Sequence, residues 1–289
     1  MHFQEIISNL LKFWKDRGCS ILHSYDIEVG AGTLSPNTAI QLITKEKFNT
    51  CYVEYCRRPV DARYGDSRNR LAHYYQMQVI MKPSPKNIQE ICILSLQEIG
   101  LDVNKHDLRF IEDDWKNPSI GASGLGYELQ CDGMEVLQFT YMQQIGGIEF
   151  DTIPCEITYG LERLAMYLQG VDHYNDIIWN ESDGKTIYYR DIYNAKQQDL
   201  QWSKYYHDYQ LDSDKLFSDL NYNIENSVKL VEQNLPYPAY DFCLKASHCL
   251  NVLDARGLLS QSERQRYILL IRQGVKNCLS YINIHKNEI

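Results

Sequence analysis

The sequence lacks the features of membrane-inserted, exported and disulfide-bonded proteins. Its 289 residues contain no run of 18 apolar residues, so we expect no membrane-spanning helix. The N-terminal residues do not follow the basic, apolar and small-residue order of a signal peptide, and we therefore expect a cytoplasmic protein. Nine cysteines are scattered singly, without a Cys-x-x-Cys pair, which argues against a disulfide framework and against a structural zinc site.

Basic residues are also scarce. Lysine and arginine number 29 against 38 aspartate and glutamate residues, which gives a net charge of −9. Proteins that neutralise the phosphates of nucleic acids usually carry a basic surface, so a broad electrostatic binding face is not expected. Any binding of nucleic acid must therefore use a local basic surface or one that another chain supplies.

Five arginines nevertheless cluster within the fourteen residues 57–70. β-prone runs flank the cluster at 51–53 and 74–81, which predicts a long antiparallel hairpin whose strands carry Arg57 and His73. Guanidinium groups bind phosphate oxygens bidentately and stay charged at any working pH, so the loop of this hairpin is expected to bind a polyphosphate. The alternative is a solvated charged loop, but the two glutamines in the returning strand argue against a purely exposed segment.

A further arginine begins a predicted helix. A strand is expected to end near Thr158, Gly160 to form a turn, and a helix to start at Leu161 with its apolar face buried. A cation in the first helical turn is disfavoured by the helix dipole, so Arg163 needs an anion nearby. A ligand phosphate would supply that anion, and a neighbouring carboxylate is the alternative.

The remaining patterns predict an α+β fold, in which an antiparallel sheet is flanked by helices and followed by a C-terminal helical domain. We expect domains at 1–205 and 206–289. Ser260 and Glu263 form a capping-box pattern that opens the last helix. The other expected elements are helices at 3–14, 86–99 and from about residue 212 onward, and strands at 20–22, 108–112, 127–130 and 135–141.

In this order and spacing, the motifs resemble those of class II aminoacyl-tRNA synthetases, and specifically the α subunit of bacterial heterotetrameric glycyl-tRNA synthetase. The hairpin is similar to motif 2, and the segment around Arg163 is similar to motif 3. The first helix with Gly30 to Pro36 is similar to motif 1, where a helix and a proline-bearing strand form a dimer interface. The resemblance extends from about residue 3 to about residue 276 and includes 28–33, 133–136, 138–141 and 160–166. The His-x-Gly-His and Lys-Met-Ser-Lys-Ser sequences of class I are absent.

This resemblance implies an enzyme that activates glycine with ATP and Mg²⁺ to glycyl-adenylate and then transfers the glycyl group to tRNA(Gly). It also implies a homodimer of this chain that joins a separate β subunit as α₂β₂, with no membrane partner. The other readings are a non-catalytic synthetase-like accessory subunit, and an ATP-dependent adenylating enzyme for another small carboxylate. The presence of arginines in both the motif 2 and motif 3 segments argues against the accessory role.

The resemblance assigns roles to individual residues. Phosphate-binding roles fall to Arg57 or Arg58 for the α-phosphate, to Arg63, Arg68, Arg70 or His73 for the β- and γ-phosphates, and to Arg163 for the γ-phosphate. Met77, where the family usually has phenylalanine, is expected to stack on adenine, and Gln78 follows it in the ATP-binding strand. The predicted substrate-binding residues are Glu135, Gln138, Thr140, Gln143, Glu156 and Thr158.

Two acids compete for one role among these residues. Glu156 is expected to hold the glycine ammonium by analogy with alanyl enzymes, and Glu135 to do the same or to bind Mg²⁺. Glu135 has the opposite parity to Gln138 and Thr140 along its strand, so it faces the same side only if a bulge re-aims it. Further departures from the family at Ala62, Ser123, Tyr127 and 54–56 leave the shape of the pocket open.

Overall fold

The computed structural model describes residues 1–192, 194–208 and 213–286. At its centre lies an eight-stranded sheet in the order β1-β2-β3-β8-β6-β5-β4, with β7 pairing to β6. All neighbouring strands are antiparallel except β1 and β2. The strands are β1 (Ser20–Ile21), β2 (Phe48–Arg57), β3 (His73–Lys82), β4 (Leu108–Asn117), β5 (Ala122–Cys131), β6 (Met134–Ile145), β7 (Ile148–Glu149) and β8 (Cys155–Gly160). The predicted α+β class is confirmed.

Three helices cover one face of this sheet: α1 (Phe3–Lys15), α3 (Ile88–Glu98) and α4 (Leu161–Gln169). Their apolar side chains form one buried core with sheet residues such as Phe139 and Ile157. Burying one such side chain stabilises a fold by about 1.5–3 kcal/mol, so this core holds α4, and the Arg163 at its start, firmly against the sheet.

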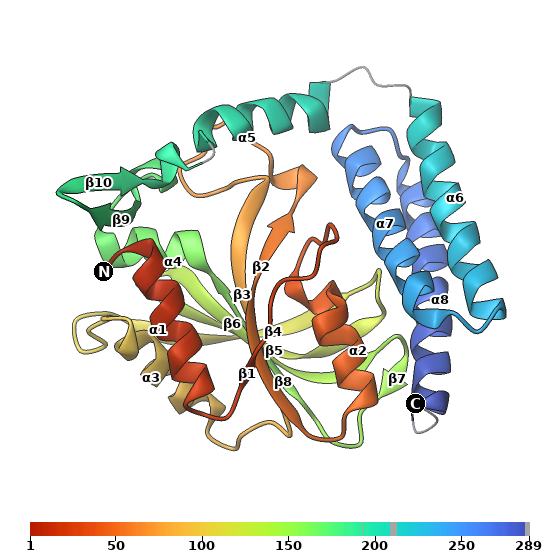
Figure 1. The fold of residues 1–289 in the computed structure, drawn as a ribbon, viewed down its shortest axis with the longest axis horizontal. Helices are drawn as coiled ribbons and strands as arrows, with labels where there is room; N and C mark the ends of the chain where they lie inside the picture. The colour runs from red at the N-terminus through yellow and green to blue at the C-terminus, as the bar shows by residue number, and fades with distance from the viewer. Residues whose placement is uncertain (193, 209–212, 287–289) are drawn as a thin grey trace.

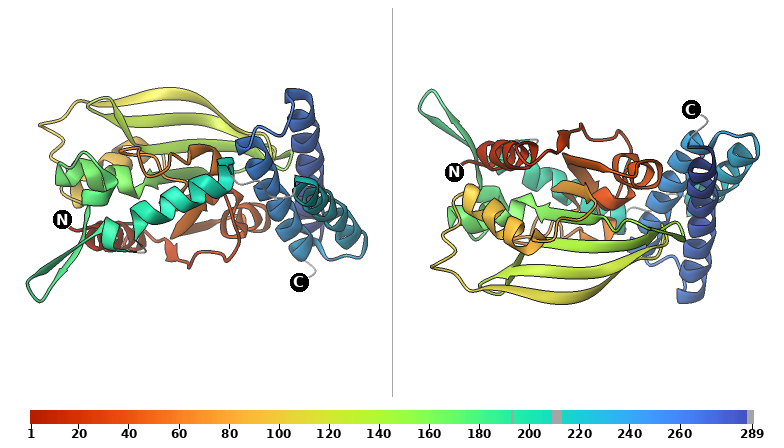
Figure 2. Two further views of the ribbon diagram at one scale, coloured as in Figure 1. Left: turned by 90° about the horizontal axis from the view of Figure 1, so that it is seen from above. Right: turned by 90° about the horizontal axis from the view of Figure 1, so that it is seen from below.

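A second core lies on the other face. It joins Ile80 and Met142 of the sheet to α2 (Pro36–Thr44), α7 (Pro236–Ala255) and α8 (Gln261–His285). Helix α6 (Ser213–Glu232) packs on α7 and α8. Figure 1 shows the three C-terminal helices grouped on the side of the sheet away from α1 and α3, and Figure 2 shows that α8 runs crosswise to the strands, near their ends.

The segment between these two parts follows the rim of the sheet. A two-stranded hairpin of β9 (Ile178–Ser182) and β10 (Lys185–Tyr188) projects from the body, and α5 (Ala195–Ser203) continues into a π-helical turn, Lys204–Asp208 (Figure 1). The predicted domain boundary at 205/206 falls inside that turn and stays a prediction. Residues 209–212, where the C-terminal helices were expected to begin, and 287–289 lie outside the described residues.

Several predicted elements are confirmed, and one is corrected. The β2–β3 hairpin pairs Phe48 with Lys82 at one end and Arg57 with His73 at the other. Ser260 accepts a hydrogen bond from the Glu263 N–H as the expected capping box. The proline-bearing strand expected from motif 1 is instead a helix, because Pro36 occupies the first turn of α2, where its missing N–H costs nothing.

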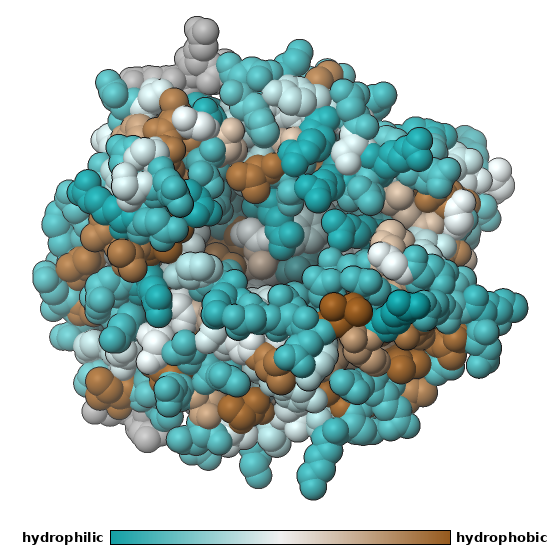
Figure 3. Space-filling view, turned by 180° about the vertical axis from the view of Figure 1, so that it is seen from behind, coloured by the Kyte–Doolittle hydropathy of each residue, from teal (hydrophilic) through white to brown (hydrophobic). Residues whose placement is uncertain are grey.

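The outer surface is mainly hydrophilic. Figure 3 shows this on the face opposite to that of Figure 1, where a hollow lies near the centre and apolar side chains appear in small groups. Within the part of the chain that the structure describes, no helix combines the length and apolarity needed to cross a membrane.

Candidate active site

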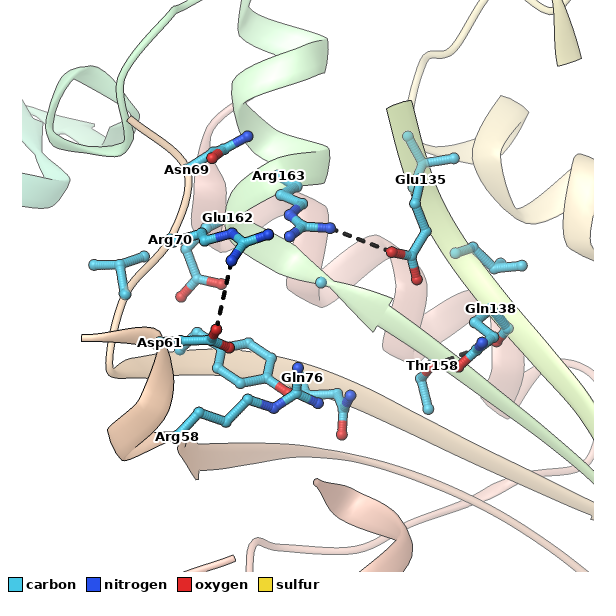
Figure 4. A pocket seen from close by; sticks show the side chains of 15 residues that line it. Arg58, Asp61, Asn69, Arg70, Gln76, Glu135, Gln138, Thr158, Glu162 and Arg163 are labelled. Atoms are coloured by element: carbon cyan, nitrogen blue, oxygen red, sulfur yellow. Dashed lines mark hydrogen bonds and ion pairs between the residues drawn. The ribbon is translucent and has the colours of Figure 1, made fainter. Parts of the chain in front are cut away.

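A cavity of about 210 Å³ opens where the β2–β3 hairpin, β6, β8 and the start of α4 meet (Figure 4). These are the segments in which the sequence predicted the two arginine motifs. The cavity is lined by Arg58, Asp61, Asn69, Arg70, Leu71, Tyr74, Gln76, Glu135, Val136, Leu137, Gln138, Thr158, Gly160, Glu162 and Arg163.

Alternation along β2 separates the two neighbouring arginines. Arg57 forms the last register pair of the hairpin with His73, and Arg58 follows it with its side chain on the other face. The Arg58 Nε donates to the Gly30 carbonyl over 2.8 Å, and its guanidinium lies 4.8 Å from the centre of the Tyr74 ring. Of the two arginines predicted for the α-phosphate, Arg58 is therefore the one that lines the cavity.

Arg57 and His73 lie outside the cavity. An Arg57 Nη is 3.7 Å from a Glu28 carboxylate oxygen, and its guanidinium faces the Trp202 ring at 5.4 Å. His73 is buried, and its Nε2 hydrogen-bonds with the Tyr206 hydroxyl at 3.0 Å. Burial, with Arg57 nearby, lowers the pKa of His73 to about 3, so the ring is neutral near pH 7. The phosphate role predicted for His73 is corrected, because its buried ring does not line the cavity and its Nε2 is engaged by Tyr206.

The loop arginines divide in the same way. Arg70 lines the cavity and lies 3.9 Å from Asp61 across its rim (Figure 4). Arg63 folds back onto its own loop, where it donates to the carbonyls of Val60 and Ala62 over 2.8 and 2.7 Å. Arg68 is exposed and does not line the cavity. The structure thus brings one of the three predicted loop arginines to the site.

Asp199 of α5 holds this loop from behind, and the sequence reading missed it. Its side chain is 5% exposed, and its two carboxylate oxygens accept the backbone N–H groups of Gly65 over 2.7 Å and Ala72 over 3.0 Å. Ser203, one turn later, accepts the N–H of Tyr64 over 2.8 Å. Because these bonds bracket Arg70, they fix the loop that presents it. In the sequence, Asp199 is one polar residue of a largely polar segment, so no local pattern indicates this role.

Arg163 faces the cavity from the first turn of α4, and an Nη lies 3.2 Å from Glu135 of β6 (Figure 4). The structure therefore shows the neighbouring-carboxylate alternative for its anion. Both side chains are more than a third exposed, at 35% and 37%, and such pairs contribute only about 0–1 kcal/mol to stability. A ligand phosphate can therefore replace Glu135 at little cost in stability.

A β-bulge places Glu135 on this face. The pairing of β5 with β6 shifts register between Leu129 and Gln130, so that Leu129 pairs with Leu137 but Gln130 pairs with Glu135. The extra residue, Val136, reverses the parity of Glu135 relative to Gln138. The bulge that Glu135 needs in order to share a face with Gln138 is thus present, and both residues line the same cavity.

Glu162 connects the two arginine motifs. Its carboxylate accepts the backbone N–H of Tyr75 in β3 over 2.8 Å and the hydroxyl of Tyr189 over 2.9 Å. Burial raises the pKa of Glu162 to about 7, although these hydrogen bonds act to lower it. The side chain therefore fixes the start of α4 against the hairpin, a role that its place beside Arg163 in the sequence did not reveal.

Met77 does not reach the cavity. It is fully buried in the core under α1, α3 and α4, on the opposite face of β3 from Tyr74 and Gln76. The adenine-stacking role predicted for Met77 is corrected, because the two-residue period of a strand gives it the wrong face. Tyr74, which carries Arg58 on its ring, is the aromatic side chain that lines the cavity.

Gln78 and Glu156 form a closed pair behind the cavity rather than part of its wall. The Gln78 side-chain amide donates to the Glu156 carboxylate, and both side chains are at most 2% exposed. Gly32 closes over them, since a Cβ at this position would lie 2.6 Å from the Gln78 side-chain oxygen. Neither residue lines the cavity, which corrects their predicted roles in binding ATP and the glycine ammonium.

The other predicted substrate residues also divide. Gln138 and Thr158 line the cavity on neighbouring strands, where they are register partners. Thr140 is 1% exposed and packs against Gly124 of β5. Gln143 is exposed near the far end of β6. Thr140 and Gln143 are therefore corrected as substrate contacts.

One group of metal-ligand types stands apart. His106, Cys131 and Asp132 place their ligand atoms within 4.8 Å of one another at the β5–β6 turn, and the His106 Nδ1 is 2.8 Å from an Asp132 oxygen. This nitrogen, sulfur and oxygen set does not suit Mg²⁺, which prefers oxygen ligands. None of the three lines the cavity, where Asp61, Glu135 and Glu162 provide the carboxylates.

Comparison with known proteins decides the family. The model of the glycyl-tRNA synthetase alpha subunit family matches residues 3–286. The chain belongs to this family. Glycine–tRNA ligase alpha subunits of Rickettsia bellii and Rickettsia prowazekii are each 49% identical to it over 280 residues, which cover 96% of this chain and 96% of each relative. Among solved structures, the pyrrolysyl-tRNA synthetase of Desulfitobacterium hafniense overlaps 64% of this alpha-subunit chain and 76% of its own, with 12% identity and a TM-score of 0.46.

The buried Glu156 predicts a pH-dependent stability. Burial raises the pKa of this carboxyl from 4.5 to about 7. Between these values the unfolded chain releases the proton before the folded chain does, so the free energy of unfolding falls as the pH rises. Glu156→Gln removes this effect and keeps an acceptor for Gln78. The variant should therefore gain stability relative to the wild type by up to roughly 3 kcal/mol between pH 4.5 and pH 8, measured by urea unfolding. A stability difference that does not change with pH would contradict the assignment.

Asp199→Asn should weaken the hydrogen bonds that hold the loop between β2 and β3. Asparagine keeps one acceptor, but its NH₂ group faces a backbone N–H donor, which costs about 1–3 kcal/mol of stability. We also expect a higher KM for ATP, since Arg70 is no longer fixed. Urea unfolding and steady-state kinetics measure these effects. Asp183→Asn, in the exposed turn of the β9–β10 hairpin, is the matched control because asparagine tolerates its left-handed backbone, with φ of 52°. An unchanged KM for ATP in the Asp199 variant would show that the hydrogen bonds of Asp199 to the loop do not position Arg70 for ATP.

Proposed function

We propose that this chain is the catalytic alpha subunit of a glycine–tRNA ligase, and that the cavity between Arg58 and Arg163 is its adenylation site. The observation that carries the proposal is the convergence of three guanidinium groups from separate elements on one cavity: Arg58 after β2, Arg70 in the hairpin loop and Arg163 in α4. Arginine forks match phosphate oxygens, and three of them suit a triphosphate.

The chemistry requires positioning and charge neutralisation. A glycine carboxylate oxygen attacks the α-phosphorus of ATP, the new oxygen–phosphorus bond forms, and the bond to pyrophosphate breaks. Neither partner needs a side-chain nucleophile, so cationic groups aimed at the developing charge supply the catalysis. Arg58, fixed by the Gly30 carbonyl, is assigned to the α-phosphate, and Arg70 and Arg163 are assigned to the leaving pyrophosphate.

The second step transfers the glycyl group. A hydroxyl oxygen of the tRNA 3′-terminal ribose attacks the glycyl carbonyl carbon, an ester bond forms, and the bond from that carbon to the adenylate oxygen breaks. AMP leaves, and its phosphate accepts the hydroxyl proton. The same Arg58 guanidinium neutralises the phosphate as charge returns to it.

The amino-acid end of the site is assigned to Gln76, Gln138 and Thr158, which line the cavity from β3, β6 and β8. Gln138 and Thr158 are register partners, and Gln76 lies two residues before the partner of Thr158 in β3. Glu135 is the carboxylate assigned to the glycine ammonium, since Glu156 is enclosed behind Gln78. Once a phosphate engages Arg163, Glu135 could equally supply an oxygen to Mg²⁺, which usually binds through one or two carboxylates and substrate phosphates. Mg²⁺ would add positive charge where pyrophosphate leaves.

Other chains complete the proposed enzyme. The net charge of −9 leaves this chain without the broad basic surface that tRNA binding needs. We therefore propose a β subunit as the partner that binds most of the tRNA, with two copies of this chain and two of the β subunit in the assembly. The proposal also places the protein in the cytoplasm, where tRNA is charged.

ATP–pyrophosphate exchange tests this function. The wild-type chain should exchange with glycine faster than with alanine by about tenfold or more, because one extra methyl overfills the site at a cost of about 1–3 kcal/mol or more. Arg58→Ala and Arg163→Ala should each lower the exchange rate by about 100- to 1,000-fold, as expected when one charged contact to a transition state is lost.

Arg57→Ala is the matched control for Arg58→Ala, since the two residues are adjacent but face opposite sides of the sheet. It should keep exchange within about tenfold of the wild type. The thermal unfolding temperature of all three variants shows whether a slower exchange comes from a lost contact with the substrate or from an unfolded protein. Absence of exchange with every amino acid would favour a non-catalytic accessory subunit. Exchange with alanine alone would overturn glycine as the substrate. An Arg57 effect as large as that of Arg58 would contradict the assignment of faces.

A further inference from the structure

A second cavity lies directly beyond Arg58. It measures about 300 Å³, within the range of small-ligand sites, and opens between the Gly30–Leu34 segment, the β4–β5 turn and α7. We call it the Lys116 groove. It is lined by Gly30, Ala31, Leu34, Arg58, Pro59, Val60, Lys116, Asn117, Pro118, Ser119, Ser247 and Asn251.

The charge of the groove is unusual for this chain. Among the residues that the structure describes, its lining includes two cations, Arg58 and Lys116, and no carboxylate, whereas the adenylation cavity contains three acids. The whole chain has nine more acidic than basic residues, so a groove without acids is a local exception. Lys116 contacts Asp114, but these side chains are 60% and 78% exposed, and such a pair separates readily. The groove therefore suits an anion.

Arg58 lines both cavities, which makes the groove a second approach to the same reaction centre. Its Nε is fixed to the Gly30 carbonyl, and Gly30 itself belongs to the wall of the groove. Arg163, Arg70 and Glu135 line only the first cavity. A molecule in the groove would therefore reach the proposed α-phosphate position without displacing Arg70 or Arg163, which are assigned to pyrophosphate.

The neutral lining suits a nucleotide chain. Asn117, Ser119 and Asn251 offer amide and hydroxyl groups for ribose and phosphate oxygens, and Val60 and Pro118 offer apolar surface for a base. Leu34, Pro59 and Ser247 also line the groove but are mostly buried. Val60 is 48% exposed and so available for contact. Polar groups of this kind contact the sugar and phosphate oxygens of a nucleic-acid backbone.

We infer that the Lys116 groove receives the single-stranded 3′ end of the tRNA, with Lys116 contacting a backbone phosphate. This inference rests on the proposed function, because only an adenylating enzyme with a second substrate, the tRNA, needs a binding groove beside the adenylate. It adds to that function the side from which the tRNA enters and the residues that guide it.

The test separates the two half-reactions in the complex of this chain with its β subunit. Lys116→Glu should leave glycine-dependent ATP–pyrophosphate exchange unchanged, and it should slow transfer from preformed glycyl-adenylate to a tRNA(Gly) transcript at subsaturating tRNA by about tenfold or more. The slope of log affinity against log salt concentration should fall by about 1, the signature of one lost phosphate contact. The chain without the β subunit serves as the reference and should charge tRNA poorly.

Lys105→Glu is the matched control, because Lys105 is another exposed lysine paired with a nearby aspartate, at 2.9 Å from Asp102, and does not line the groove. Asn251→Ala provides an independent variant on α7 and should also slow transfer alone. Equal loss of exchange and transfer in Lys116→Glu would overturn the inference in favour of a groove that binds ATP or pyrophosphate. Unchanged transfer in both groove variants would overturn it outright. Failure of the wild-type chain to exchange would instead count against the proposed function.

Discussion

The site depends on the alternation of side chains along the largely buried central strands of the sheet. In β2, β3 and β8, one set of side chains packs into the core under α1, α3 and α4, so the other set is directed toward the cavity side. This constraint decides between neighbouring residues of similar chemistry: Arg58 rather than Arg57, and Tyr74 and Gln76 rather than Met77. A shift of one residue in register would exchange the two sets, which the long hairpin of β2 and β3 prevents through ten paired residues on each strand.

The exception to this alternation is as important as the rule. The bulge at Val136 turns Glu135 toward the cavity, where it meets Arg163. Glu135 thereby gives Arg163 the anion that a cation in a first helical turn needs. The pair keeps the guanidinium at the cavity in the absence of ligand and, being partly exposed, releases it without a large energetic penalty. Glu162, the residue before Arg163 in α4, fixes the helix start to β3 and so sets the distance across the cavity.

Local patterns predicted much of this fold. The hairpin, the first helix, α3, the strand and turn before Arg163, and the Ser260 capping box all follow from short-range periodicity and turn chemistry, and the structure confirms them. The prediction of a proline-bearing strand from the resemblance to motif 1 was wrong, because Pro36 is equally suited to begin a helix and lies in the first turn of α2. The hairpin β9–β10 and helix α5 were not predicted, since their apolar periodicity is weak.

The site was harder to predict than the fold, for a physical reason. Arginine clustering identified a loop that lines the cavity, but which side chains face the cavity depends on parity, on one bulge and on long-range contacts. Asp199 holds a loop more than 120 residues earlier in the chain, since its partner Ala72 is 127 positions away. His73 looked like a phosphate ligand in the sequence, yet burial keeps it neutral. Such outcomes follow from tertiary packing, which a single sequence does not display.

The central claim is that Arg58 and Arg163 face each other across a phosphate site, with Glu135 in place of the ligand. A crystal structure of the chain with a non-hydrolysable glycyl-adenylate analogue tests this claim most directly. The account predicts that the Arg58 guanidinium contacts the group in the α-phosphate position at about 2.7–2.9 Å. It also predicts that the analogue occupies the cavity lined by Gln76, Gln138 and Thr158. An analogue bound on the Arg57 side of the sheet, or one that makes no contact with Arg58, would contradict it.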